Sequence, residues 1–448
     1  MKRLDVEPTQ ETLLEVMKSD RARRNDDIKD FVRLLDKTEG PYAYMIDSAW
    51  GAGKTFFVKS VELVLRAMNP KLTLVDTCPE PLPDFAKELE GVSSVFVPYY
   101  FNAWENDFAH DPLSALLANM AIAFDREGIL KDRDCKNALY ALIDAALSVT
   151  PISGVGAAAK ALTGSSLVSG FESLQKVRDR LNGLADTMAF EGKAKLVIFV
   201  DELDRCRPDF SVRLLEQTKS MFNNRKVIFV FSADSQQLAK AVGGMYGDGF
   251  DSARFLERFF DRKVLLTPVD GFLFAMGGGL HAGTELYERM VRECADRDAL
   301  TIREAYRLQQ KIEGAMRESR KQVHQSNLSH FAYQAILPLL VFIERDDHQL
   351  FRSIVSGADF DGLYEYGSKY ETFADAVGRC CPEVNSEALM DGAQAEERRR
   401  TFVHDLCVVI FGNSSMGSER ENARMRLGRS SYVDFPERVF KRLEFPDE

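Results

Sequence analysis

The chain has 448 residues, 45% of them apolar and 28% charged, a composition that excludes extended disorder and predicts two or three packed units. Its net charge of -11 at pH 7 opposes any general attraction to polyanions, so the sequence carries no strong nucleic-acid signal. The seven cysteines form no CxxC pair and the first residues contain no apolar segment, so we expect a cytoplasmic protein without a secretory signal.

The first predicted elements surround a glycine-containing turn. Apolar residues at helical spacing predict a helix over residues 10–37, and Gly40-Pro41 would end it. An aromatic and apolar stretch at 42–46 predicts a strand, and residues 56–65 predict the next helix. The order of strand, glycine-containing turn and helix is typical of a phosphate-binding loop.

A second strand is predicted over residues 94–101, followed by a helical insertion at about 108–190. Within this insertion, residues 145–159 carry no formal charge. These fifteen residues include one proline and two glycines, whereas a spanning helix needs about 20 apolar residues. We therefore expect no integral membrane segment.

Two continuous apolar runs, residues 195–200 and 226–231, predict central parallel strands that are buried on both faces. Beyond residue 272 the pattern changes to long helical stretches, including 299–317 and 331–342. The sequence thus predicts an α/β core over residues 1–270, followed by a helical lid and a C-terminal helical domain over residues 271–448.

Residues 48–55 match the phosphate-loop pattern G-x-x-x-x-G-K-[ST], or Walker A motif, except that serine replaces the first glycine. The remaining glycines let backbone N–H groups converge on phosphate oxygens, and the following helix directs its positive N-terminus at the same charge. Lys54 is expected to contact the β- and γ-phosphates of ATP, and Thr55 to ligate Mg²⁺. The expected nucleotide-binding residues are Ser48, Ala49, Trp50, Gly51, Ala52, Gly53, Lys54, Thr55 and Phe56.

The strand predicted at 195–200 delivers two carboxylates to the carboxyl edge of the sheet, where open α/β sheets bind ligands. Like a Walker B pair, Asp201 is expected to hold Mg²⁺ and Glu202 to polarise the attacking water. A strand that merely ends in two solvated acids is the alternative, and the phosphate loop argues against it. The fold class is therefore an α/β P-loop NTPase with a parallel sheet.

Two further residues are candidates for the same site. Arg205 could sense the nucleotide or reach a neighbouring subunit, or it could form a structural contact with Asp204. Ser232 follows the strand predicted at 226–231, where it could touch the γ-phosphate or simply cap the strand.

Five blocks in order give the chain a resemblance to the KAP P-loop NTPases, the family of Kidins/ARMS and PifA. They are residues 50–55, 101–104, 201–206, 255–258 and 301–304. The resemblance implies a core with an additional strand, a lid that carries Arg303 as a second sensor, and Phe101 to Trp104 near the nucleotide. The chain departs from the family pattern at Ser48, at Glu202, where many members carry aspartate, and at Arg258, where lysine is usual.

The resemblance also implies an ATP-driven switch of conformation or oligomerisation, used in antiphage defence, exclusion or signalling. A homo-oligomer or an effector protein would be the partner. The alternative is a scaffold that holds ATP, hydrolyses little of it and acts through its C-terminal helical region. A nuclease that uses Asp346, Asp347 and His348 is disfavoured because consecutive residues project in different directions. ATP rather than GTP follows from the resemblance and from the absence of an Asn-Lys-x-Asp motif.

Overall fold

The computed structural model describes residues 7–126, 194–266, 285–381 and 392–428, with short gaps at 21, 70–71, 73–78, 80, 248, 298–299, 320–326 and 413–415. Most of the predicted helical insertion, including residues 145–159, lies outside the described residues. The chain divides into two compact units, one within Glu7–Pro268 and one within Val269–Glu448. Each unit is described by itself.

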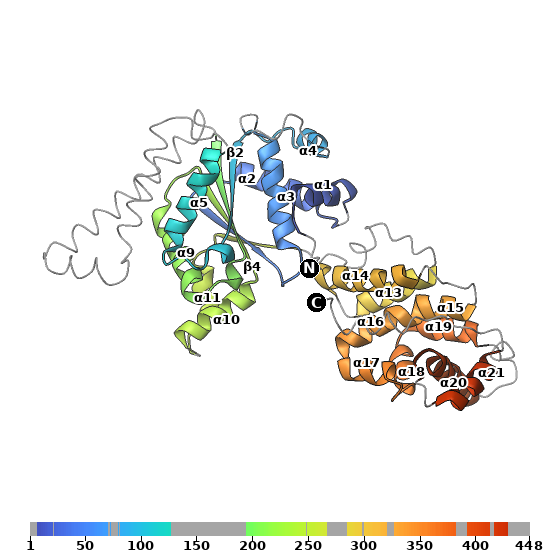
Figure 1. Cartoon of the computed structure of the whole chain (residues 1–448). Helices are drawn as coiled ribbons and strands as arrows, with labels where there is room; N and C mark the ends of the chain where they lie inside the picture. The colour runs from blue at the N-terminus through green and yellow to red at the C-terminus, as the bar shows by residue number, and fades with distance from the viewer. Residues whose placement is uncertain are drawn as a thin grey trace. The chain divides into compact units, whose positions relative to one another are not determined.

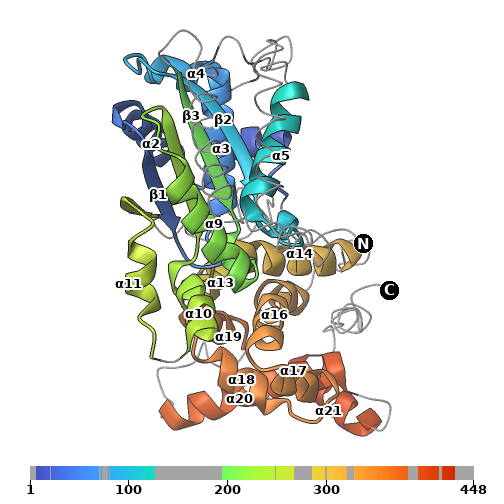
Figure 2. The ribbon, with the colours of Figure 1, turned by 90° about the vertical axis from the view of Figure 1, so that its left-hand side faces the viewer.

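The first unit is built on a five-stranded parallel sheet in the order β2-β3-β4-β1-β5 (Figures 1 and 2). Its strands are β1 Tyr42–Asp47, β2 Val95–Asn102, β3 Ala194–Asp201, β4 Val227–Ala233 and β5 Arg262–Leu265. The four predicted strands are confirmed to within two residues at each end. Because β4 lies between β1 and β3, the additional strand that the family resemblance implied is present.

Sequence reasoning missed β5, which pairs with β1 at the edge of the sheet. It has four residues, begins with Arg262 and Lys263, and is largely exposed. A short, charged strand is typical of a sheet edge, where it discourages pairing with other chains, and it shows little of the apolar run that marks a buried strand.

Helices cover both faces of the sheet, as Figure 1 shows. Side chains of β3 alternate between the two faces. Val197 and Phe199 join the core formed with α1, α2, α3 and α4, whereas Ile198 and Val200 join the core formed with α5, α9, α10 and α11. This double burial explains the continuous apolar runs of the central strands. The helices are α1 Gln10–Ser19, α2 Asn25–Lys37, α3 Lys54–Ala67, α4 Leu82–Glu88, α5 Pro112–Arg126, α9 Pro208–Met221, α10 Ser235–Tyr246 and α11 Ser252–Glu257.

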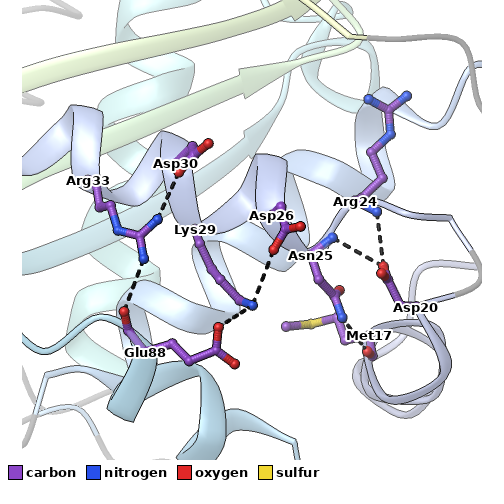
Figure 3. Close-up of polar contacts among 9 residues, drawn as sticks. All are labelled: Met17, Asp20, Arg24, Asn25, Asp26, Lys29, Asp30, Arg33 and Glu88. Carbon is purple, nitrogen blue, oxygen red and sulfur yellow. Dashed lines mark hydrogen bonds and ion pairs between the residues drawn. The ribbon is translucent and has the colours of Figure 1, made fainter.

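The single helix predicted over residues 10–37 is wrong, because the structure has two helices, α1 and α2, that meet at a turn (Figure 3). Asp20 takes a left-handed conformation (φ 45°), and its carboxylate accepts the backbone N–H groups of Arg24 and Asn25 at 3.0 and 3.2 Å. The Asn25 amide in turn donates to the Met17 carbonyl at 2.8 Å. These side chains bond the backbone N–H and carbonyl groups that are left without partners at the two helix ends. The periodicity of apolar residues does not reveal such a break between helices.

Figure 3 also shows how α2 holds α4. The Lys29 ammonium, on a side chain only 10% exposed, pairs with Glu88 on α4 and with Asp26, and the hydrogen bond with Glu88 raises the pKa of Lys29. Arg33 donates to the Glu88 carbonyl at 3.1 Å. A nearly buried cation is tolerated here because it is paired.

The second unit is helical in its described part, which confirms the predicted helical C-terminal region. The predicted helix at 331–342 lies within a longer helical run that contains one π turn, and Pro338 lies just beyond that turn. Proline has no N–H to donate to the carbonyl four residues earlier, so a wider turn before it is expected. The helical segments are α13 Glu285–Arg297, α14 Ile302–Ser319, α15 Asn327–Phe331, the π turn η4 Ala332–Ile336, α16 Leu337–Asp346, α17 His348–Val355, α18 Asp361–Gly367, α19 Glu371–Cys380, α20 Gly392–Phe411 and α21 Gly417–Leu427. Among the residues that the structure describes, no helix is both long enough and apolar enough to cross a bilayer.

Candidate functional site

The candidate site lies at the carboxyl edge of the sheet, where strand register brings its polar residues together. Asp201 at the end of β3 is paired with Asn102 of β2 on one side and with Ser232 of β4 on the other. Asp47, the last residue of β1, is paired with Ala233 of β4. The phosphate loop therefore begins beside β4, the strand that carries Ser232, and one strand away from Asp201.

The phosphate loop joins β1 to α3 and depends on two glycines with left-handed backbone, Gly51 (φ 81°) and Gly53 (φ 87°). Gly53 is the N-cap of α3, and no side chain caps this end. The N–H groups of the first turn thus remain open to an anion, which a helix N-terminus attracts. Thr55 and Phe56 lie in that first turn, so all the predicted loop residues, from Ser48 to Phe56, form one segment.

Lys54 is turned back onto the phosphate loop. Its ammonium donates to the carbonyl oxygens of Ser48 and Ala49 at 2.6 and 3.2 Å. Burial lowers the pKa of Lys54, and four carboxylates oppose that effect. They belong to Asp204, Asp234, Asp201 and Asp47. The site thus combines one partly buried cation with a surrounding negative field.

Asp201 is 1% exposed, and its two carboxylate oxygens are both engaged. One accepts the hydroxyl of Tyr100 at 2.9 Å, and the other accepts the backbone N–H of Glu202 at 2.9 Å. Burial and the charge of Asp201 raise the pKa of Tyr100, which therefore remains a neutral donor at physiological pH. Sequence reasoning missed Tyr100; the signal was a tyrosine two residues before the end of the strand beside β3.

Glu202 has a left-handed backbone (φ 59°), which costs a residue with a side chain about 1–2 kcal/mol. Its carboxylate lies 3.1 Å from the guanidinium of Arg205, at the end of the short helix η3 Leu203–Arg205. The suggested structural contact between Asp204 and Arg205 is wrong. Asp204 instead accepts the indole N–H of Trp50 at 2.6 Å and the backbone N–H of Asp234 at 2.8 Å, which ties η3 to the phosphate loop and to the residue that follows β4.

Ser232 is fully buried, and its hydroxyl has no hydrogen-bond partner within the described part of the chain. The residue lies inside β4 rather than after a strand ending at 231, and Asp234 is the residue that caps the following helix. The strand-cap alternative for Ser232 is therefore not supported. A buried hydroxyl without a partner costs about 1–3 kcal/mol, a cost that a bound polar group would remove.

A second polar group, also missed by sequence reasoning, fastens the start of the phosphate loop. Asp47 accepts the backbone N–H and hydroxyl of Ser235 at 2.8 and 2.6 Å, and pairs with Lys263 of β5 at 3.2 Å. Burial opposes ionisation of Asp47, but these hydrogen bonds and the Lys263 charge hold its pKa below the usual value. A cavity of about 430 Å³ lies beside this group, lined by Asp47, Ser48, Ala49, Asp234, Gln236, Leu265 and Leu266.

The remaining candidates lie in the second unit. Arg303 lies in the first turn of α14. Because this helix belongs to the second unit and the phosphate loop to the first, its role as a second sensor stays a prediction. Asp346 ends α16, and Asp347 caps α17 by accepting the backbone N–H of Leu350 at 2.9 Å, which gives Asp347 a structural role. Across the described residues, no three His, Cys, Asp or Glu side chains are grouped as a metal cage. Thr55 and Asp201 are the kind of sparse oxygen donors that Mg²⁺ uses when phosphates and waters complete its shell.

No curated protein matches the sequence. One solved structure, "Structure of C. elegans PCH-2", is similar over 80% of this chain and 68% of its own, at 10% identity and a TM-score of 0.25. So low a TM-score supports no conclusion. The model of the KAP family P-loop domain, in contrast, matches residues 24–270, more than half of the chain. The chain therefore belongs to the KAP family of P-loop NTPases.

Proposed function

We propose that this protein binds Mg-ATP at the carboxyl edge of its sheet, hydrolyses it, and uses the cycle as a conformational or oligomerisation switch. The observation that carries the proposal is the strand register, which sets Asp201 beside Ser232 and places Ser232 on the strand next to the one that leads into the phosphate loop. A sheet that served only as a scaffold would not need a strained Glu202 or a buried hydroxyl that no described residue bonds.

The residues of the chain take the following roles. Lys54 leaves the Ser48 and Ala49 carbonyls to bind the β- and γ-phosphates, while the N–H groups around Gly51 and Gly53 bind phosphate oxygens. Thr55 and Asp201 would hold Mg²⁺, which offsets the charge that develops on the phosphates. Glu202 orients the attacking water and accepts its proton, and Ser232 donates a hydrogen bond within the same site.

Two variants, compared with wild type, test this function. Phosphate release with Mg²⁺ and ATP should be measured for wild type, Glu202→Gln and Lys54→Ala, while light scattering follows the assembly state. We expect wild type to turn over, Glu202→Gln to bind ATP without turnover, and Lys54→Ala to lose binding. A wild type that binds ATP with no phosphate release would favour the scaffold alternative.

The role of the switch in defence or signalling is proposed on the family membership alone. Its test is phage infection of a host that expresses wild type or Glu202→Gln. Equal protection by both would separate any defence role from ATP hydrolysis.

A further inference from the structure

The guanidinium of Arg205 lies between two groups of the site. On one side its nitrogen is 3.1 Å from a carboxylate oxygen of Glu202. On the other, its central carbon is 5.5 Å from the centre of the Trp104 ring, which belongs to the turn after β2 and is 52% exposed. An ion pair and a cation–π contact thus hold one cation at the carboxylate proposed as the catalytic base.

Lys54 and Arg205 are each satisfied here by the protein's own oxygens. Lys54 donates to two neutral carbonyls, and Arg205 pairs with one carboxylate. A γ-phosphate carries more charge and more acceptor oxygens than a carbonyl group or a carboxylate. The planar guanidinium of arginine also suits the geometry of phosphate oxygens. An incoming γ-phosphate therefore competes with Glu202 for Arg205.

The phosphate loop and η3 are joined by a side-chain hydrogen bond. The indole N–H of Trp50, in the loop, donates to Asp204 at 2.6 Å, and Asp204 immediately precedes Arg205. Asp204 also contributes to the electrostatic field at Lys54. Arg205 accordingly projects from a turn that is bonded to the phosphate loop.

We propose that the Arg205 side chain passes from Glu202 to the γ-phosphate of bound ATP. In this exchange the Glu202 carboxylate is released to the attacking water, and the guanidinium leaves the Trp104 ring. ADP lacks the γ-phosphate and leaves the ion pair intact. Turnover of ATP in this scheme rests on the proposed function, but the exchange itself requires only that the nucleotide binds.

The chain has two tryptophans, and both lie at this site, so fluorescence can follow the exchange. In Trp50→Phe, Trp104 is the only tryptophan that emits. We expect its emission to change with Mg²⁺ and a non-hydrolysable ATP analogue and to stay constant with Mg²⁺ and ADP, with binding of each nucleotide measured by calorimetry. If Trp50→Phe binds poorly, the difference between wild type and Trp104→Phe gives the same signal.

Substitutions at Arg205 and at Arg213 separate the loss of this exchange from the general effect of removing a positive charge. When Arg205→Met is added to Trp50→Phe, the ATP analogue and ADP should no longer differ in their effect on Trp104 emission. In the otherwise wild-type chain, Arg205→Met should lower kcat about 100-fold or more, as loss of a charge contact in the transition state does, and leave ADP affinity within twofold. Arg213→Met, on the exposed side of α9, serves as the matched control and should change neither readout.

Equal emission changes with ADP and the ATP analogue would overturn the exchange, as would no change with a bound analogue. A nucleotide-specific Trp104 signal in a protein that releases no phosphate would sustain the exchange while refuting the proposed hydrolysis. Hydrolysis without that signal would sustain the proposed hydrolysis and refute the exchange.

Discussion

The hydrogen bond from Tyr100 to Asp201 should contribute measurably to the stability of the first unit. Asp201 is 1% exposed, so water cannot replace the lost donor in Tyr100→Phe. A hydrogen bond to a charged group contributes about 1.5–3 kcal/mol, and the buried acceptor places this one toward the upper end. For a unit of this size the loss corresponds to about 3–12 °C in Tm.

Tyr99→Phe is the matched control for this prediction. Tyr99 is also nearly buried, and its ring packs edge-on against Phe124, but its hydroxyl makes no hydrogen bond with the described residues. Calorimetry would compare both variants with wild type, and the transition that Mg-ATP raises would identify the first unit. If Tyr100→Phe and Tyr99→Phe unfold within about 0.5 kcal/mol of each other, the assigned role of the Tyr100 hydroxyl is refuted.

Three further predictions follow from particular contacts. Gly53→Ala places a side chain at φ 87°, so we expect a cost of about 1–2 kcal/mol and loss of ATP binding by calorimetry, whereas Gly244→Ala, in α10 with open space at its Cβ, should cost nothing. Arg426→Ala leaves the 2%-exposed carboxylate of Asp405 without its bidentate partner and should destabilise the second unit by about 2–4 kcal/mol in thermal unfolding; a loss below about 0.5 kcal/mol would contradict this. Because the folded pKa of Asp47 is depressed, its ionised form stabilises the fold above the unfolded pKa of about 3.9, and this stabilisation is lost as pH falls through the folded pKa. Asp47→Asn should therefore have a lower Tm than wild type at pH 7, and the two Tm values should approach each other near pH 3. A difference in Tm that stays the same at both pH values would argue against a stabilising, ionised Asp47.

Sequence reasoning succeeded where a local pattern has one physical outcome. The runs at 195–200 and 226–231 became central strands because only a strand covered on both faces needs so many consecutive apolar residues. The phosphate loop was recognised because glycine, lysine and threonine at that spacing suit few other turns. Reasoning failed at Asp20 and at β5, where a cap and an edge pairing outweighed periodicity.

The sequence by itself determined the α/β core, its family and the segments that meet the nucleotide, since these depend on apolar periodicity and on a continuous motif. Only the tertiary structure decided what each polar group touches. It set Tyr100 on Asp201, Arg205 on Glu202 rather than on Asp204, and Ser232 in a buried place where no described residue bonds its hydroxyl. These contacts join strands and turns far apart in the chain, and their geometry follows from strand register, which no local pattern encodes.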